Sequence, residues 1–231
     1  MSKRSEIIDG YKASTANRGL IYTEVLGWID LGHARGDDVK KLMGKLREGE
    51  ASGKKYYDVK YIQSMLARGV LRTGKYIEWR IKRGRTYYEQ QSITLAMMMT
   101  CARKFEAFQS AFPNNLVTDS GFSGEDLVSD LLGFYRVMSI HNPFHILRPL
   151  NKDEALRRWD HYGPIGSFKN ESFTPLLFPD PARFPHAKPY WSELPPFMKT
   201  IMPYGDFSSG NVSVSTNDGT YIKIGKVESR L

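Results

Sequence analysis

Residues 88–112 read YEQQSITLAMMMTCARKFEAFQSAF and predict a long helix of the core. Apolar residues recur along it at intervals of three and four, which places their side chains on one face of an α-helix. This face consists of Leu95, Met98, Cys101, Ala102, Phe105, Phe108 and Phe112. Pro113 follows directly, with Asn114 and Asn115 behind it, and ends the helix because proline lacks the backbone N–H.

Before this helix, Lys75 to Lys82 alternates between apolar and polar residues. Ile77, Trp79 and Ile81 share one side, which is typical of a half-buried strand. The four residues from Arg72 to Lys75 are a candidate turn, since they contain glycine. Further helices are predicted from similar periodicity. They begin at residues 37–38, 123 and 152.

The C-terminal third differs in composition, because eleven of the twelve prolines lie from Pro143 onward. Proline disfavours long helices and central strands, so we expect residues 164–203 to wrap over the core in an ordered, irregular path. Its apolar anchors are Phe173, Leu176, Leu177, Phe178, Phe184, Tyr190, Trp191 and Phe197. Residues 212–224 alternate around Asn217-Asp218-Gly219, which predicts a β-hairpin.

These elements predict an α+β fold: a mainly helical core, a basic hairpin region, a Pro-rich wrapping segment and a C-terminal β-hairpin. We expect one domain over residues 1–231. The helical core would occupy 1–142, including the basic segment 53–88, and 143–231 would hold the wrap and the hairpin.

Composition excludes several classes of protein. The 41% hydrophobic and 13% aromatic content exclude wholesale disorder. Cys101 is the only cysteine, which excludes a disulfide scaffold and cysteine-based structural zinc, and its place on the apolar stripe predicts a core residue. Apolar runs fall short of the roughly 20 residues of a membrane helix. The first ten residues carry no apolar stretch, so we expect synthesis in the cytoplasm without a signal peptide.

The net charge of +8 is concentrated in residues 53–88, where ten basic residues face only Asp58 and Glu78. Seven aromatic residues lie in the same segment. Three interpretations stay open: a solvated sheet face, a surface attracted to an anionic envelope polymer or lipid, and a site for single-stranded nucleic acid. Trp79, Arg80 and Lys82 are its candidate substrate-binding residues.

Enzyme motifs such as GxSxG, GxxxxGK[ST], GxGxxG and HExxH are absent from the sequence. One candidate site lies where an apolar alternation ends in Gly32-His-Ala-Arg35 before a helix. His33 titrates near neutrality, and Asp30 or Glu24 could orient it as an acid or base. The alternative is a half-buried turn residue bonded to Asp30. Arg35 is a candidate anion-binding residue.

A second candidate is the segment from Ser123 to Asp130. Ser123 and Asp126 are spaced as a helix cap, which alone explains the motif. Alternatively, Glu125 or Asp126, with Asp130 one turn on, supplies an acid, a base or a metal ligand. Glu106, at the edge of the apolar stripe, is a further candidate. The candidate catalytic set is therefore His33, Glu106, Glu125, Asp126 and Asp30, and the candidate ligands of a divalent metal are His33, Glu106 and Asp130.

The segment from Tyr22 to Asp38 resembles an element of an uncharacterised bacterial family of unknown function, Y-T…G-x-I-D-x-x-H-x-R…D. That family is similar in having a Glu-bearing long helix and then an F-S-x-E-D-L-x-S-N-L-L-G block. Residues 122–133 match this block, except that Asp130 stands where the family tends to asparagine. Order and rough spacing agree over about half of the chain.

The resemblance carries no established activity but implies association with the cell envelope, since many relatives look like lipoproteins or exported proteins. It singles out Asp30, His33, Arg35, Glu106, Glu125 and Asp126.

Residues 21–33 are also similar to the I-Y-x-D-x-x-G-x-x-T-I-G-x-G-H hairpin of phage-type lysozymes. The glycine-to-histidine interval is two residues shorter here, and Thr15 stands nine residues before Glu24, where a glutamate would be needed. The catalytic pair of lysozyme therefore does not carry over, and the similarity slightly favours peptidoglycan as a target.

The leading hypothesis is a hydrolase of the bacterial envelope, acting on peptidoglycan as an antibacterial effector. Such a protein would reach the periplasm of a target cell through a contact-dependent secretion machine, and an immunity protein or that machine would be its partner. Two alternatives stay open: a non-enzymatic module that binds an envelope polymer or partner protein, and a nucleic-acid-binding protein using residues 53–88.

Overall fold

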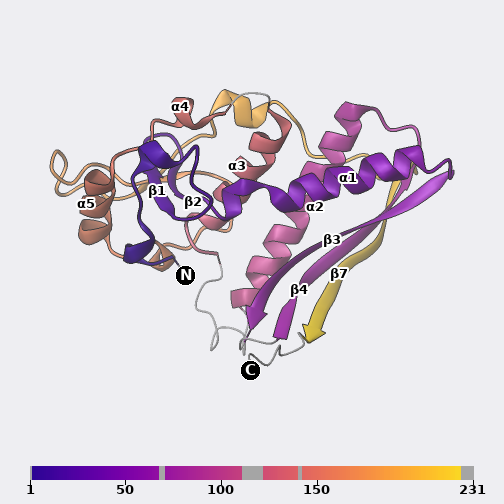
Figure 1. The fold of residues 1–231 in the computed structure, drawn as a ribbon, viewed down its shortest axis with the longest axis horizontal. Helices are drawn as coiled ribbons and strands as arrows, with labels where there is room; N and C mark the ends of the chain where they lie inside the picture. The colour runs from indigo at the N-terminus through magenta and orange to yellow at the C-terminus, as the bar shows by residue number, and fades with distance from the viewer. Residues whose placement is uncertain (1, 68–70, 111–121, 140–141, 225–231) are drawn as a thin grey trace, which may run out of the picture. The chain divides into compact units, whose positions relative to one another are not determined.

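The fold is α+β, as predicted, and a computed structural model describes residues 2–67, 71–110, 122–139 and 142–224 (Figure 1). The chain divides into two compact units. Unit 1 comprises Met1–Asp37 and Phe122–Thr200, and unit 2 comprises Asp38–Gly121 and Ile201–Leu231. The single domain stays a prediction, and the limits of these units do not follow the predicted division at residue 142.

Unit 1 contains a four-stranded sheet in the order β1-β2-β5-β6. The strands are β1 (Leu20–Thr23), β2 (Gly27–Asp30), β5 (Leu176–Leu177) and β6 (Tyr190–Trp191). The pairs β1–β2 and β5–β6 are antiparallel, and β2–β5 is parallel. The helices of this unit are α3 (Asp126–Met138), α4 (Phe144–Leu147) and α5 (Lys152–Tyr162). Its short 3-10 turns are η1 (Arg4–Glu6), η2 (Gly10–Lys12), η3 (His33–Arg35), η5 (Ile165–Ser167) and η6 (Pro196–Lys199).

The core of unit 1 forms around Tyr22 of β1. Its ring meets Trp28 and Phe178 edge-on, and its hydroxyl donates to the Phe178 carbonyl at 2.8 Å and accepts from the Phe178 N–H at 2.7 Å. Burial raises the pKa of this hydroxyl to about 12. The Pro-rich segment is thereby fixed to β1.

The eight predicted anchors of the Pro-rich segment differ in burial. The four from Phe173 to Phe178 are buried, which confirms the prediction for them, and Phe197 is half-buried. Phe184, Tyr190 and Trp191 are more than half exposed, so the prediction is wrong there. For Tyr190 and Trp191 the reason is that β6 is a two-residue strand at the sheet edge, where it pairs with β5.

Unit 2 contains a three-stranded antiparallel sheet in the order β3-β4-β7. The strands are β3 (Tyr56–Ala67), β4 (Leu71–Lys82) and β7 (Val212–Ile224), and they lie side by side in Figure 1. The helix α2 (Tyr87–Ser110) lies against β3 and β4, with the Cys101 thiol 3.6 Å from the Lys75 carbonyl oxygen. Cys101 is fully buried, as predicted.

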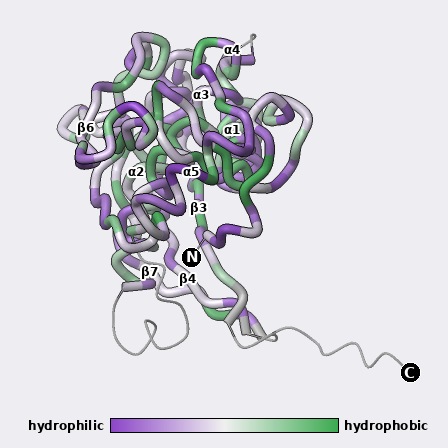
Figure 2. The backbone as a smooth tube through the Cα atoms, turned by 90° about the vertical axis from the view of Figure 1, so that its left-hand side faces the viewer, coloured by the Kyte–Doolittle hydropathy of each residue, from purple (hydrophilic) through white to green (hydrophobic). Residues whose placement is uncertain are grey.

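The helix α1 (Asp37–Ala51) follows η3 and confirms the helix predicted at residues 37–38. Figure 2 shows both green hydrophobic and purple hydrophilic backbone in the region labelled α1, as expected of a helix with one buried face. Val39, Leu42, Met43 and Leu46 form this face. The α2 stripe is likewise buried from Leu95 to Phe105, while Phe112 and the predicted stop at Pro113 lie outside the described residues. The helix predicted from residue 152 is confirmed by α5.

Two predicted turns lie inside strands instead. The residues from Arg72 to Lys75 belong to β4, where Gly74 is needed because a Cβ there would collide with the Gln63 carbonyl oxygen of β3. The C-terminal segment forms β-structure, but Asn217-Asp218-Gly219 lies within β7, where the register with β4 shifts between Tyr76 and Trp79. In both places glycine serves close approach or a bulge rather than a turn.

No helix among the described residues is long and apolar enough to cross a membrane.

Candidate acid–base site

The candidate site of unit 1 begins at the end of β2, where the Asp30 side chain forms a local turn. Its Oδ1 accepts hydrogen bonds from the Gly32 N–H at 2.6 Å and the His33 N–H at 3.4 Å. The Asp30 N–H donates to Ser129 Oγ of α3 at 3.0 Å, which fastens the strand end to that helix. Asp30 therefore positions the His33 backbone, in agreement with one of the two interpretations of the sequence.

Two glycines allow η3 to lie directly against α3. A Cβ on Gly133 would lie 2.8 Å from the His33 carbonyl oxygen, and one on Gly36 would collide with the Gly133 carbonyl oxygen. Gly36 also has a φ of 66°, in the left-handed region that favours glycine. One turn further along α3, Arg136 donates to the Ala34 carbonyl at 2.5 Å. The backbone that carries His33 is thus held at several points of one helix.

This contact brings His33 to Asp130. The imidazole Nδ1 lies 2.9 Å from Asp130 Oδ1, and the side chains are 37% and 10% exposed respectively. Burial lowers the pKa of His33, but the ion pair and hydrogen bond with Asp130, and the charges of Asp126 and Asp30, outweigh it and raise the pKa well above 6.5. The pair with Asp130 therefore favours the protonated ring, in which Nδ1 donates to Asp130.

A protonated histidine can act as a general acid. Its second N–H, on Nε2, is a proton donor at neutral pH, as general acid catalysis requires. Metal ligation needs a neutral imidazole, which the raised pKa of His33 disfavours. Across residues 2–67, 71–110, 122–139 and 142–224, no group of three or more His, Cys, Asp or Glu side chains is placed to hold a metal ion. The divalent metal of His33, Glu106 and Asp130 stays a prediction.

Arginine side chains lie near the same turn. Arg35 pairs with Asp37 at 2.5 Å and is 41% exposed. Burial and the charge of Arg35 lower the pKa of Arg136, so the two guanidinium groups repel each other. Asp37 already offsets part of this repulsion, since it pairs with Arg35 and raises the pKa of Arg136, and the anion-binding role of Arg35 stays a prediction.

Glu125 is buried and hydrogen-bonded to neighbouring serine side chains. It is 1% exposed, and its oxygens accept from the Ser2 hydroxyl at 2.6 Å and from the Ser123 hydroxyl. Asp126 accepts from the Ser123 N–H at 3.1 Å, but the N-cap of α3 is Glu125, without a capping hydrogen bond from its side chain, so the predicted cap by Ser123 is wrong. Glu125 therefore ties residue 2 to the start of α3, whereas Asp126 remains half-exposed and contributes charge to His33.

The remaining candidates lie in unit 2. Glu106 is 2% exposed on α2, and its proximity to His33 stays a prediction. Trp79 is 2% exposed with its ring edge on Phe207, so it is a core residue and not a surface contact for a substrate. Arg80 pairs with Asp58 at 2.9 Å, while Lys82 is exposed.

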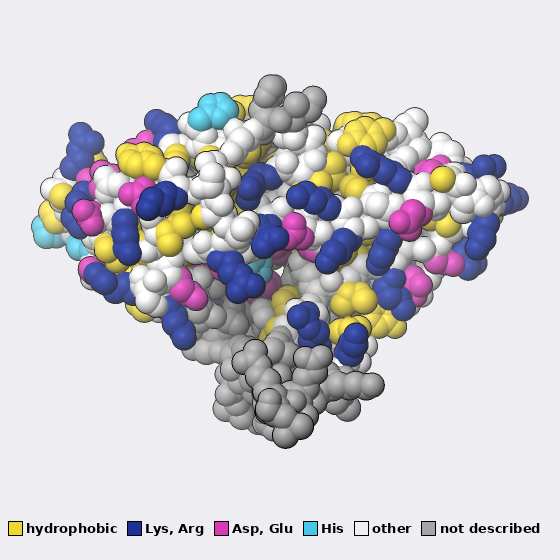
Figure 3. Space-filling view, viewed as in Figure 1, with side chains coloured by type: hydrophobic (Ala, Val, Ile, Leu, Met, Phe, Trp, Pro, Cys, Tyr) yellow, Lys and Arg dark blue, Asp and Glu magenta, His cyan; other side chains and the backbone are white. Residues whose placement is uncertain are grey.

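The basic segment is thus partly neutralised by its own cross-strand pairs. Lys60 lies 3.6 Å from Glu78, and Lys75 lies 3.0 Å from Asp218 of β7. On the face drawn in Figure 3, magenta Asp and Glu side chains lie among the dark-blue Lys and Arg side chains. The solvated-face interpretation therefore accounts for much of the alternation along β4.

Gly36, which positions His33, carries no signal in the sequence. Ser129 and Gly133 belong to the F-S-x-E-D-L-x-S-N-L-L-G block that residues 122–133 match, but the block does not indicate that they position His33. Gly133 inside a predicted apolar helix face is a further hint, since glycine lowers helix propensity and is retained for close packing. No protein-family model, curated protein or solved structure matches this chain.

Proposed function

We propose that the protein is a hydrolase in which His33 is the general acid and Asp130 orients it. The observation that carries the proposal is the 2.9 Å contact between two side chains that are 97 residues apart in the chain. Perturbed histidines in partly exposed sites are characteristic of acid–base catalysis. The His33 side chain is 37% exposed, and the proposal requires that Nε2 be within reach of a bound substrate.

In the proposed reaction, a water molecule adds to the electrophilic centre of the scissile bond. Asp126, on α3 one turn before Asp130, accepts the proton of that water. His33 Nε2 donates its proton to the leaving oxygen or nitrogen as the bond breaks, while Asp130 keeps the hydrogen bond to Nδ1. Proton exchange with solvent then returns Asp126 and His33 to their starting states.

The proposed substrate is an anionic polymer of the bacterial envelope, with peptidoglycan as the first choice. Arg35 beside the site supports an anionic substrate, and the family resemblance supports the envelope. Delivery to the periplasm of a target cell belongs to the same proposal.

The test is digestion of purified peptidoglycan sacculi, followed by mass spectrometry of the released fragments. We expect His33→Gln to release fragments at least about 100-fold more slowly than the unchanged protein. His186→Gln is the matched control, because His186 is an exposed histidine of the same unit. Equal rates for His33→Gln and the unchanged protein would contradict a catalytic role of His33. If neither protein releases fragments, peptidoglycan is not the substrate.

A second candidate function is the non-enzymatic binding of a polyanion, including single-stranded nucleic acid, at the basic end of β3 and β4. Tyr56 is 41% exposed, Lys55 lies 5.6 Å from its ring centre, and Lys82 is its partner across the strands. The Arg83 N–H donates to the Lys55 carbonyl at 3.0 Å, which brings the two basic residues together. Exposed rings flanked by cations suit stacked bases and phosphates.

Binding of a fluorescent oligothymidylate at several salt concentrations tests this candidate. We expect affinity to fall with salt, with a slope of about −0.7 for each phosphate contact, and Lys82→Ala to reduce that slope. Arg80→Ala is the control, since Arg80 is already paired with Asp58. Salt-independent binding, or equal effects of the two variants, would contradict a site at this end of the sheet.

A further inference from the structure

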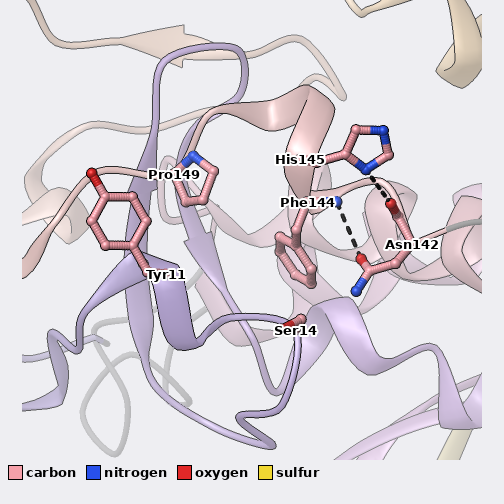
Figure 4. Close-up of a pocket in the computed structure, with 7 residues that line it drawn as sticks. Tyr11, Ser14, Asn142, Phe144, His145 and Pro149 are labelled. Atoms are coloured by element: carbon pink, nitrogen blue, oxygen red, sulfur yellow. Dashed lines mark hydrogen bonds between the residues drawn. The ribbon is translucent and has the colours of Figure 1, made fainter.

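We propose that a surface pocket of unit 1, separate from His33, binds a neutral sugar ring. The pocket has a volume of about 350 Å³ and lies between η2 and α4. Its lining residues are Gly10, Tyr11, Ser14, Asn142, Phe144, His145 and Pro149. Figure 4 draws Tyr11 and Pro149 on one side, Asn142 and His145 on the other, and Phe144 between them.

The walls of the pocket are held by backbone contacts. The Gly10 N–H donates to the Leu150 carbonyl at 3.0 Å, and the Leu150 N–H donates to the Tyr22 carbonyl of β1 at 2.9 Å. A Cβ on Gly10 would collide with the Leu150 carbonyl oxygen, so glycine is required for this close approach. Asp9 accepts from the Tyr11 N–H at 2.9 Å and fixes the turn that carries the Tyr11 ring. The pocket is therefore preformed.

The polar groups at the far wall have fixed directions. Asn142 Oδ1 accepts from the Phe144 N–H at 3.1 Å, which leaves the amide NH₂ as a donor toward a ligand. His145 Nδ1 lies 2.8 Å from the Asn142 carbonyl oxygen and must donate to it, so Nε2 is an acceptor in the neutral ring. The Tyr11 and Ser14 hydroxyls can both donate and accept.

This set matches the chemistry of a saccharide. Sugar hydroxyls both donate and accept, and a pyranose presents a C–H face that packs on aromatic rings. Tyr11 offers a ring that is 70% exposed, and Phe144 is a buried ring with the Arg136 guanidinium 4.8 Å from its centre. Among the described residues, the lining includes no Lys, Arg, Asp or Glu, which favours a neutral ligand over an ionic one.

The inference does not depend on catalysis at His33. A bound sugar would position a glycan polymer for the proposed hydrolase, or would serve the non-enzymatic alternative equally well. Its test therefore measures binding in the His33→Gln variant as well as in the unchanged protein. Loss of hydrolysis with retained sugar binding separates the two proposals.

The experiment titrates N-acetylglucosamine and its tetramer into the full chain, with saturation-transfer NMR and calorimetry as readouts. We expect saturable binding of the neutral sugars, and a loss of about tenfold in affinity for Tyr11→Ala, which removes an exposed ring. Tyr190→Ala is the control, because Tyr190 is 53% exposed in the same unit and is not a lining residue. We expect it to bind as the unchanged protein does.

A smaller loss is expected for His145→Ala, which removes one acceptor, and His145→Gln should restore part of it. Thermal unfolding of each variant checks that the fold is intact. Saturable binding of inorganic phosphate at this pocket, absence of sugar binding, or equal losses in Tyr11→Ala and Tyr190→Ala would overturn the proposal.

Discussion

Two contacts need a glycine for close approach: that between η3 and α3 in unit 1, and that between β3 and β4 in unit 2. They differ in how far their charged side chains are exposed to solvent. His33 and Asp130 meet across 97 residues, and the Asp130 side chain is only 10% exposed. Arg80 and Asp58 meet across one hairpin, with side chains 57% and 40% exposed. The exposed pair also has a shifted pKa, because the hydrogen bond from Arg80 lowers the pKa of Asp58. Its charges lie in solvent, however, which screens them, so chemistry is expected at η3 and solvation at β4.

Gly36→Ala should have the largest effect on this comparison, because it prevents η3 from lying against α3. The left-handed φ of 66° and the collision with the Gly133 carbonyl predict a loss of about 2–4 kcal/mol in the free energy of unfolding. Urea denaturation measures it.

Gly44→Ala is the matched control, since a Cβ there meets nothing within 4 Å and the residue lies inside α1. We expect a gain of about 0.5–1 kcal/mol, as for other glycines replaced in helices. Equal stability of the two variants would mean that the close approach at Gly36 is not tight.

Asp130→Asn should have the next largest effect. It keeps the size of the side chain but removes the charge that holds the His33 proton, so we expect a loss of about 100-fold in the rate of fragment release. We expect the free energy of unfolding to fall by about 1–2 kcal/mol, a modest value because the imidazole ring is partly exposed and solvent screens the pair. Glu125→Gln is the comparison variant. If Glu125→Gln abolishes fragment release while Asp130→Asn does not, Glu125 and not Asp130 is the carboxylate that the reaction needs.

The pH dependence of stability should distinguish the two regions as well. Because the folded pKa of His33 is raised, the stabilisation from its pair is fully present below the unfolded pKa of about 6.5 and is lost as the pH rises through the folded pKa. Urea denaturation between pH 6 and pH 10 should show this loss, and Asp130→Asn should flatten it. An unchanged profile in that variant would assign the loss to other groups.

Arg80→Ala should have the smallest effect, because its pair with Asp58 is exposed to solvent. We expect a change in the free energy of unfolding that is clearly smaller than that of Asp130→Asn, and smaller still in high salt. Urea denaturation at two salt concentrations measures it. A loss as large as that of Asp130→Asn would show that exposure does not separate the two pairs.

The sequence predicted the local elements well, because their signals are periodic. The stripe of α2 and the alternation of Ile77, Trp79 and Ile81 depend only on neighbouring residues, and both are confirmed. Glycine misled the prediction at Gly74 and Gly219, since the same residue serves turns, bulges and close approaches.

The candidate site was predictable only as separate residues. His33 and Asp130 were both named, but their pairing depends on Ser129, Gly36 and Gly133, which act between segments far apart in the chain. The same holds for the pocket, because Tyr11 and His145 come to line it only when residues 149–150 pair with β1. No local pattern carries such information.

The titration of His33 by ¹H–¹⁵N NMR tests the pairing of His33 with Asp130 most directly, since it observes the ring itself. We expect the His33 resonances to titrate with a pKa well above 6.5 in the unchanged protein, and Asp130→Asn to move that pKa down. A His33 pKa near 6.5 that is the same in both proteins would contradict the acid–base role of the pair.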